Sequence, residues 1–389
     1  MRDLGWTMGV VWVWVWVGQA GAAAPGERAL DVEINAAGCV RHDALVDVPV
    51  DFETLATKSG AAMPLTARSV NVVEVSLAGR IVDRATPFQF NCVGRGLGTL
   101  SILLGGRTQA NATRHFRVSF RQAGKTFTAR KVRPRIEVVK DYEHQGLDSF
   151  RIVTPSAWWY YHKQGAGFAG LWDANGNDWI GYRPKGGSAG HYRGIPNLVH
   201  PEGYFHPGGA KCTSTLLADG PLKAIIQSRS KDGKWACRWD ITDAWARLTV
   251  LKAAHPYWFL YEGTPGGKLD TSRQFCVRCD GMRTPAAQRW TSDLPGDEWV
   301  YFADAKLRRA LVLVHHHRDE HVDSYWPMQN NMTVFGFGRK GLTKHMTQVP
   351  AQFTVGFCES TDPKVVAAAI AAITRPPKVT VRAKPKPRK

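Results

Sequence analysis

The sequence predicts an all-β protein with a small N-terminal β-sandwich, a large antiparallel sandwich and one short C-terminal helix. Short apolar segments rich in Val, Ile, Phe and Tyr recur between Gly, Pro, Asn and Asp turns along almost the whole chain. Clear helical periodicity is confined to one segment near the C-terminus. Hydrophobic residues make up 44% of the 389 residues, enough for two packed cores.

Residues 1–24 have the pattern of a secretory signal peptide. Arg2 precedes an apolar run over residues 8–17, and small residues follow with A-x-A cleavage sites at 20–22 and 22–24. The run is shorter than the roughly 20 residues that span a bilayer, and no later stretch comes close. We therefore expect a secreted or periplasmic protein without an integral membrane segment.

The net charge of +18 points to an acidic partner. Seven Lys or Arg lie in residues 375–389, and the chain before them keeps a net charge of +11. For an exported protein this charge favours an acidic polysaccharide or oligosaccharide, or a membrane or cell-wall surface, over nucleic acid. The Pro-rich tail, residues 376–389, has no apolar face, so we expect it to be disordered, solubilising and dispensable for catalysis.

The small β-sandwich is predicted for residues 28–121. The period of two in H-F-R-V-S-F places Phe116, Val118 and Phe120 on one face. Residues 122–135 carry Gly, Pro and five Lys or Arg, and are expected to connect the two domains. The strand candidates of this domain are residues 46–52, 69–75, 81–83, 99–104 and 115–120.

The large domain is predicted for residues 136–375. Evenly spaced apolar segments indicate an antiparallel sandwich. Residues 363–373 form the one helical segment, with Thr361 or Asp362 as N-cap and Pro363 in the first turn. The strand candidates are residues 149–154, 157–161, 223–228, 235–241, 246–251, 257–263, 310–315 and 352–357.

Part of this domain resembles a known family. The stretch G-A-G-F-A-G-L-W-D-A-N-G-N-D-W-I-G-Y (residues 165–182) is similar to the opening hairpin of galactose-mutarotase-like β-supersandwich domains, which begin with a glycine-led strand, a D-x-x-G turn and a second strand. The segments G-P-L-K-A-I-I, W-A-C-R-W-D-I and A-R-L-T-V-L continue the pattern. Such domains occur in aldose epimerases, several polysaccharide lyases and some glycoside hydrolases. The resemblance implies a large antiparallel β-supersandwich that binds carbohydrate, and it leaves the reaction open.

Seven cysteines in an exported chain leave at least one thiol unpaired. Cys39 with Cys92, and Cys212 with Cys237, are candidate disulfides because each pair lies within one predicted domain. The lone C-V-R-C at residues 276–279 is interpreted as structural. Cys358, on an apolar strand, is expected to be a buried free thiol.

The densest polar stretch is H-Y-R-G-I-P-N-L-V-H-P-E-G-Y-F-H, residues 191–206, which we call the histidine loop. Its Gly and Pro residues forbid a continuous helix, and ordered loops of this length are often functional. The alternative is a rigid surface loop whose histidines only bind backbone groups. The catalytic candidates in it are His191, Tyr192, Arg193, Asn197, His200 and Tyr204.

A second polar cluster, H-H-H-R-D-E-H-V-D-S-Y-W at residues 315–326, follows an apolar strand. Imidazole and carboxylate groups suit a divalent metal, so residues 315–321 are a candidate metal site, with a polar subsite as the alternative. We expect this cluster and the histidine loop to share one cleft. The substrate-binding candidates in the domain are Trp158, Trp159, His206, Glu262, His316, Glu320, His321 and Tyr325.

Tryptophan content also fits sugar binding, because eleven Trp follow residue 154 and indole faces suit pyranose rings. Trp158 and Trp159 are adjacent in a strand, so one of them faces outward and is a candidate stacking platform.

Three functions follow from these residues. The first is a polysaccharide lyase that cleaves a uronate-containing polymer by β-elimination, with Arg193 and Asn197 neutralising the carboxylate and the His and Tyr side chains of the loop transferring protons. The second is a glycoside hydrolase that pairs Glu262 with Asp319 or Glu320. The third is a non-catalytic carbohydrate-binding or epimerase-like protein.

Overall fold

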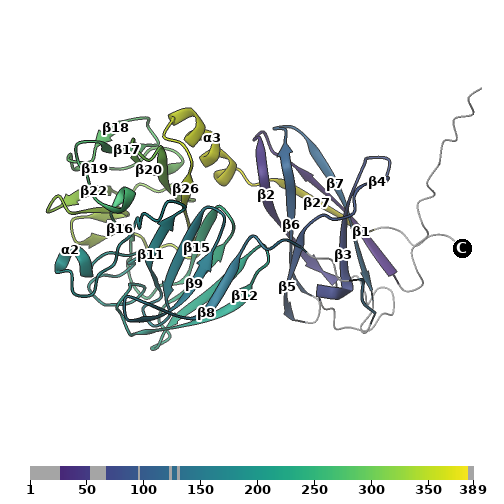
Figure 1. Ribbon diagram of the computed structural model, residues 1–389, viewed down its shortest axis with the longest axis horizontal. Coiled ribbons are helices and arrows are strands. Elements are labelled where there is room, and N and C mark those ends of the chain that lie inside the picture. Colours follow the sequence, from purple (N-terminus) through teal and green to yellow (C-terminus); the bar gives the residue numbers. More distant parts are fainter. Residues whose placement is uncertain (1–26, 53–66, 95–96, 122–124, 129–131, 384–389) are drawn as a thin grey trace, which may run out of the picture.

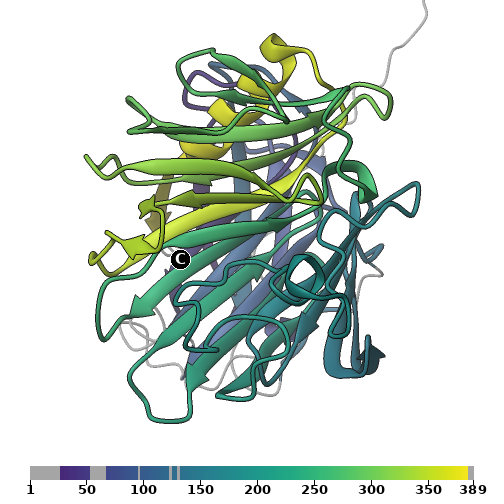
Figure 2. The same cartoon turned by 90° about the vertical axis from the view of Figure 1, so that its left-hand side faces the viewer.

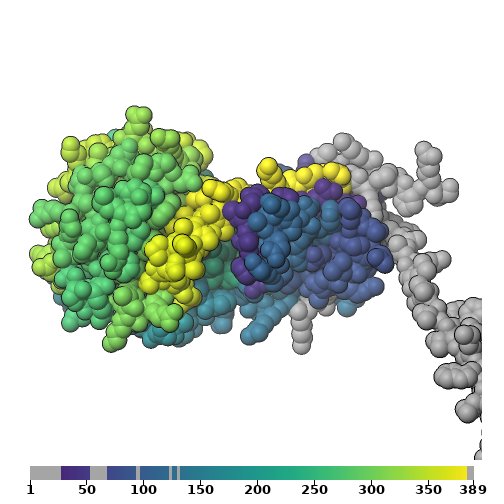
Figure 3. Space-filling view, turned by 90° about the horizontal axis from the view of Figure 1, so that it is seen from above, coloured from purple at the N-terminus to yellow at the C-terminus, as the bar shows by residue number. Residues whose placement is uncertain are grey.

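The computed structural model describes residues 27–52, 67–94, 97–121, 125–128 and 132–383. Two β-sandwiches lie side by side (Figure 1), and a narrow waist between them is visible from above, where the yellow C-terminal residues span the junction (Figure 3). The predicted signal peptide lies outside the described residues. Among those that are described, no helix has the length and apolar character needed to cross a membrane.

The N-terminal sandwich packs a five-stranded sheet on a three-stranded one around a core that includes Val32, Val48 and Phe116. The predicted strand 81–83 is confirmed with the same bounds. The five-stranded sheet has the order β27 (Lys378–Ala383), β1 (Glu27–Asn35), β7 (Thr113–Arg121), β3 (Val70–Val75) and β4 (Ile81–Asp83), with the 3-10 turn η1 (Ala67–Ser69) before β3. The other sheet has the order β2 (Arg41–Asp51), β6 (Leu97–Thr108) and β5 (Phe88–Gly94).

Strand β27 corrects the prediction of a disordered tail over residues 376–389. It pairs antiparallel with β1 along its whole length, from Asn35 opposite Lys378 to Leu30 opposite Ala383. Val379 packs against the core of the N-terminal sandwich. Pairing with β1 and the packing of Val379 therefore order this basic segment, while residues 384–389 lie outside the described part of the chain.

The large domain contains a nine-stranded antiparallel sheet, which faces the viewer together with the rest of the domain in Figure 2. All the strands predicted for this domain are present, so the antiparallel sandwich is confirmed. The sheet has the order β12 (Cys212–Asp219), β13 (Ala224–Ser230), β14 (Ala236–Ile241), β15 (Trp245–Lys252), β26 (Ala351–Cys358), β21 (Arg309–His315), β20 (Glu298–Asp304), β17 (Gln274–Arg278) and β18 (Arg283–Pro285).

Two four-stranded sheets form the opposing layer. One has the order β11 (Gly167–Asp173), β10 (Ala157–His162), β9 (Leu147–Val153) and β8 (Glu137–His144), and the other has the order β16 (Phe259–Gly263), β23 (Met332–Phe337), β22 (Asp323–Met328) and β19 (Trp290–Ser292). The core between the layers joins Trp159 and Tyr261 of this layer to Trp239 and Phe353 of the nine-stranded sheet. Small elements on this side are α2 (Ser188–His191), η2 (Pro265–Gly267), β24 (Arg339–Lys340) and β25 (Thr343–Lys344).

Helix α3 (Pro363–Thr374) confirms the predicted C-terminal helix, and Asp362 is its N-cap, accepting from the amides of Lys364 and Val365. Its buried face packs on the side of the nine-stranded sheet that faces away from the main core. The C-terminal end is capped by Arg41 of the N-terminal sandwich, whose guanidinium donates to the carbonyls of Ala372, at 2.9 Å, and Arg375. A permanently charged side chain thus satisfies helix carbonyls that would otherwise lack partners.

The predicted disulfides are not present, since no disulfide bond joins any of the cysteines. Cys212 and Cys237 lie on β12 and β14, which are separated by β13, so two inter-strand spacings keep their sulfurs apart. Cys39 instead points at the carbonyl of Ala371 in α3. The buried free thiol predicted at Cys358 is confirmed.

Candidate functional site

Five of the sixteen residues of the histidine loop form a strand-like segment and are not part of a free surface loop. Gly194 exchanges two backbone hydrogen bonds with Glu262 of β16, at 2.8 and 3.0 Å, and the amide of Leu260 donates to the carbonyl of Pro196. On its other edge Ile195 pairs with Phe168 of β11. Residues 194–198 therefore join the two four-stranded sheets into one continuous layer, at the end of the domain that carries α2 in Figure 1.

Arg193 anchors this segment. Its side chain is buried, Nη1 donates to the carbonyl of Gly181 at 3.1 Å, and Nη2 donates to the carbonyl and side-chain oxygen of Asn331 at 3.2 and 3.3 Å. Gly181 has a φ of 69°, and a Cβ there would lie 2.9 Å from Nη1, so glycine is required for this contact. These contacts match the anchoring alternative, and they leave the guanidinium with little capacity for a substrate carboxylate.

Glu262 and Asn197 form a buried polar pair on the outer face of β16. Asn197 donates through Nδ2 to Oε2 of Glu262, and both residues are buried. Burial raises the pKa of Glu262 to about 8, against the smaller opposing effects of the Asn197 hydrogen bond and the nearby charge of Arg339. The carboxyl is therefore protonated at neutral pH, and Oδ1 of Asn197 has no hydrogen-bond partner among the described residues.

On the same face of the sheet, aromatic and imidazole rings from the loop gather together. The rings of Tyr192 and His200 meet edge to face with centroids 4.9 Å apart, and His191 lies 5.9 Å from Tyr192 and 6.2 Å from His206. Tyr182 approaches His191 and His206 from the preceding turn. His191 is exposed, while Tyr192 and His200 are half-buried, so these three form the accessible part of the group.

His200 and His206, the two less exposed histidines of this group, are neutral at pH 7. Burial lowers the pKa of His200, and the positive charge of Lys344 lowers it further. Burial lowers the pKa of His206 to about 4, and its Nε2 lies 3.0 Å from the carbonyl of Tyr192. His206 therefore holds the backbone of the loop, whereas His200 is a half-buried neutral imidazole beside a cation, Lys344, whose Nζ lies 4.5 Å from the ring of Trp258.

Several predicted site residues lie elsewhere. Tyr204 donates to Asp232 at 3.1 Å, outside the ring group. The hydroxyl of Tyr325 donates to the carbonyl of Ala286 within the core, because alternation along β22 turns its ring inward. His316 lies on the opposite face of its strand from His315, with Nε2 2.8 Å from the hydroxyl of Thr354. Tyr325 is thus unsuited to bind substrate.

The second cluster centres on His315 and a glutamate that the sequence motifs did not single out. Nδ1 of His315 lies 2.5 Å from Oε2 of Glu298 and 3.8 Å from Oδ2 of Asp319. His321 stacks near His345, and Glu320 is exposed. Glu298 could have been found from the register of the β20–β21 hairpin, which sets it directly opposite His315; Lys344 and Arg339, on a short irregular hairpin, carry no comparable signal.

His315, at the start of the second cluster, and the histidine loop lie on opposite faces of the β16–β23–β22 sheet, so the prediction of a shared cleft is wrong for this end of the cluster. Val334 of β23 packs with Tyr192 and Ala189 on the outer face, and Glu262 is its cross-strand partner. Phe337 lies three positions after Val334 on β23, so alternation points its side chain to the opposite face. It faces the inner core and lies 5.8 Å from the ring of His315. The same geometry excludes a hydrolytic pair of Glu262 with Asp319.

The outer face of β10 and β11 presents the predicted aromatic platform. Trp158 is 44% exposed whereas Trp159 is 1% exposed, which confirms that one of the two faces outward. Trp172 lies opposite Trp158 on β11, and their rings are 6.4 Å apart with an interplanar angle of 9°. Two nearly parallel indoles therefore form a flat, partly accessible surface on the same layer as the histidine loop.

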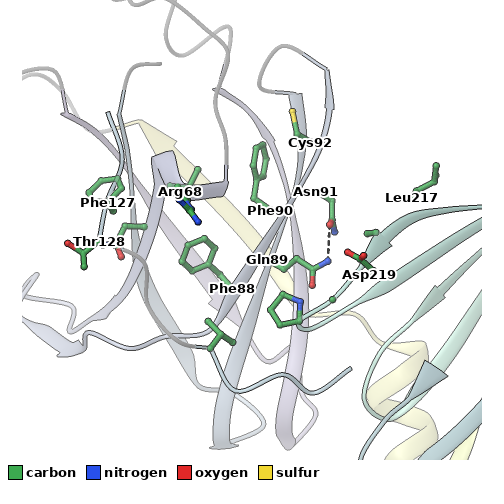
Figure 4. Close-up of a pocket in the computed structure, with 16 residues that line it drawn as sticks. Arg68, Phe88, Gln89, Phe90, Asn91, Cys92, Phe127, Thr128, Leu217 and Asp219 are labelled. Carbon is green, nitrogen blue, oxygen red and sulfur yellow. Dashed lines mark hydrogen bonds between the residues drawn. The ribbon is translucent and has the colours of Figure 1, made fainter. Parts of the chain in front are cut away.

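A separate cavity of about 430 Å³ lies between the two sandwiches. Figure 4 shows Phe88, Phe90 and Phe127 from the N-terminal sandwich around it, with Leu217 and Asp219 on the side of the large domain. None of the residues that line it belongs to the histidine loop or to the second cluster.

Comparisons with known proteins identify no family for this chain. No protein-family model matches, and no curated protein matches. Among solved structures, the crystal structure of HI1317 is similar to 59% of this chain and 98% of its own, with 12% identity and a TM-score of 0.41. A galactose mutarotase related enzyme from Lactobacillus acidophilus covers 55% of this chain and 98% of its own, with 10% identity and a TM-score of 0.37. An active YidC insertase covers 63% of this chain and 47% of its own, with 11% identity and a TM-score of 0.34. None of these likenesses bears on what this chain does.

Proposed function

We propose that the protein acts on an acidic saccharide at the histidine loop, by β-elimination at a uronate residue. The observation that carries the proposal is the group of His191, Tyr192 and His200, whose rings gather at the accessible part of the loop, where the positive charge of Lys344 is near enough to lower the pKa of His200. A neutral imidazole next to a positive charge suits a base that takes a proton from a carbon beside a carboxylate.

The role of each residue follows from its pKa, its ring contacts or its burial. His200 is the base, because its lowered pKa keeps it unprotonated at neutral pH. Tyr192, in ring contact with His200, is the acid for the leaving oxygen. Lys344 takes the neutralising role first considered for Arg193 and Asn197, since both of those side chains are buried and engaged with the protein itself.

Binding of the rest of the sugar chain is assigned to the aromatic platform. The exposed face of Trp158, with Trp172 beside it, offers a stacking surface for the apolar face of a pyranose ring. The net positive charge of the chain favours an acidic polymer over a neutral one.

The test is to incubate the purified protein with a panel of uronate-containing polysaccharides and to follow the ultraviolet absorbance of the unsaturated product. His200→Gln should lower turnover on the order of 10² or more, in the range that one general acid–base group contributes. His42→Gln, at an exposed position of the N-terminal sandwich, is the control and should keep full turnover. If no polymer yields an unsaturated product, or if His200→Gln keeps wild-type turnover, β-elimination at this site is wrong.

An epimerase-like reaction is the second candidate, and Glu262 favours it. A buried, protonated carboxyl on the same face of the sheet as the histidine loop is a suitable proton store for moving hydrogen at a sugar carbon without breaking the chain. This reaction would exchange a carbon-bound hydrogen of a monosaccharide for deuterium in D₂O, observed by proton NMR, with no unsaturated product. Binding without either change would indicate a carbohydrate-binding protein.

A further inference from the structure

The structure contains a second candidate site that the proposed saccharide chemistry does not use. We propose that Glu298, His315 and Asp319 bind one divalent cation of the zinc type, at the open end between the two layers of the large domain. This site lies on the inner side of the β16–β23–β22 sheet, whereas the histidine loop lies on the outer side.

The donor atoms are close enough to share one ion. One carboxylate oxygen from each acid and one imidazole nitrogen lie within 4.8 Å of one another. Zinc binds such nitrogen and oxygen donors at about 2.0–2.2 Å, which separates tetrahedral ligands by roughly 3.3 Å. The separations from His315 Nδ1, 2.5 Å to Glu298 and 3.8 Å to Asp319, bracket that value. Side-chain shifts of less than about 1 Å would therefore seat the ion.

Each proposed ligand is oriented by a second contact. The His315 ring stacks on Phe353 with centroids 4.8 Å apart. The other oxygen of Glu298, Oε1, accepts the amide of Asp319 at 2.7 Å. Oδ1 of Asp319 accepts the amide of His321, also at 2.7 Å, which leaves Oδ2 facing His315. Such supporting contacts are typical of metal ligands, because they fix the direction of each donor before the ion binds.

The charge around these groups also calls for a cation. Glu298 and Asp323 are buried, and Asp319 is half-buried. Among the described residues, no Lys or Arg forms an ion pair with Glu298, Asp319 or Asp323. Buried carboxylates without a positive partner are costly, and a divalent ion would compensate them.

A further nitrogen is available beside the three ligands. Nδ1 of His317 is buried and has no hydrogen-bond partner in the described part of the chain, and its ring lies 5.8 Å from that of His315. His317 and Asp319 are both half-buried, so the ion has a route from solvent. The geometry thus supplies three ligands, a candidate fourth and an entrance.

The ion would tie two strands of the nine-stranded sheet to the loop that leads into the opposing layer, so it should stabilise the domain. The experiment uses the full chain, produced without a polyhistidine tag, stripped with a chelator and dialysed. Zinc chloride is then titrated at pH 7.5 by isothermal calorimetry, and thermal unfolding is measured with and without zinc. One zinc per chain should bind, and zinc should raise the melting temperature.

Glu298→Gln and Asp319→Asn keep size and shape but remove a charged donor, so each should weaken zinc binding at least tenfold and abolish the thermal shift. Glu320→Gln, an exposed acid in the same loop, is the matched control and should bind as the wild type does. If a variant fails to fold, circular dichroism identifies it and the other variant decides. The proposal is overturned if the wild type binds less than one zinc. It is also overturned if Glu298→Gln and Asp319→Asn, like the control Glu320→Gln, bind zinc as the wild type does.

Discussion

Arg193 illustrates, at the scale of one residue, how contacts decide between a catalytic and a supporting role. Its guanidinium joins the turn at Gly181 to the β22–β23 connection at Asn331, through hydrogen bonds to both. Arg193→Lys keeps the charge but loses the planar fork that spans the two partners. We expect the free energy of unfolding to fall by about 1–3 kcal/mol, because buried acceptors lose their donors.

Urea unfolding of Arg193→Lys measures this loss, with Arg183→Lys as the control because Arg183 is exposed. Activity per folded molecule should be retained if Lys344 neutralises the substrate. A variant with unchanged stability and lost turnover would return Arg193 to the catalytic group.

Glu262 makes the stability of the protein depend on pH. Its folded-state pKa is raised to about 8 by burial, whereas an unfolded Glu titrates near about 4.3. Between these values the folded chain holds a proton that the unfolded chain releases, so this carboxyl makes the protein less stable as pH rises. Glu262→Gln cannot ionise and should be more stable than the wild type at pH 8, by on the order of 1–3 kcal/mol.

At pH 4 most wild-type molecules carry a protonated Glu262 in both the folded and the unfolded state. The difference in stability between Glu262→Gln and the wild type should therefore shrink towards zero. Urea titrations of both proteins at pH 4 and pH 8 give the comparison. Since Glu298 and Asp323 are present in both proteins, their own pH dependence cancels. A constant difference at the two pH values would show that the Glu262 pKa is not raised.

At the scale of strands, the sequence predicted which segments form strands far better than which strands lie next to each other. The alternation in A-W-W-Y-Y is sufficient to send Trp158 outward and Trp159 inward, because the period of two belongs to any strand. The face on which the histidine loop lies depends instead on pairing with β16 and β11, which are separated from it in sequence. The disulfide prediction failed for the same reason, because β13 intervenes between the two cysteine strands.

The outer aromatic surface of β10 and β11 gives a prediction for binding. Trp158→Ala should weaken binding of an acidic oligosaccharide by roughly fivefold, in line with the about 1 kcal/mol of a stacking contact. Trp326→Ala is the matched control, because Trp326 is 39% exposed on β22 of the same layer. Affinity electrophoresis of both variants in polysaccharide-containing gels makes the comparison, and equal retardation would remove the platform from the binding surface.

At the scale of the molecule, the two sandwiches are joined by charged contacts as well as by the chain. Arg135 pairs with Asp43 of the N-terminal sandwich at 2.9 Å and with Asp243 of the large domain, and Lys223 pairs with Asp47. Gln89 adds hydrogen bonds to the backbone of Leu222 and Lys223. Together with Arg41 on α3, these contacts favour unfolding of both sandwiches in one transition.

Strand β27 is the part of this arrangement that is simplest to remove. Truncation after Arg375 should cost on the order of 2 kcal/mol, because β1 loses its hydrogen-bonded partner and Val379 leaves the core. The exposed edge of β1 should also promote aggregation. Thermal unfolding and size-exclusion chromatography test this against truncation after Ala383, which keeps the strand. Equal behaviour of the two truncations would mean that β27 contributes nothing.

Because a ribosome makes the chain from its N-terminus, the pairing of β1 with β27 also imposes an order in time. Residues 27–121 emerge first, yet their five-stranded sheet keeps an open edge until residues 378–383 have been synthesised. Throughout that interval β1 is a template to which another extended chain can add. The first domain to be made is therefore the last to be completed, and a holding chaperone would be most useful while the large domain is still being translated.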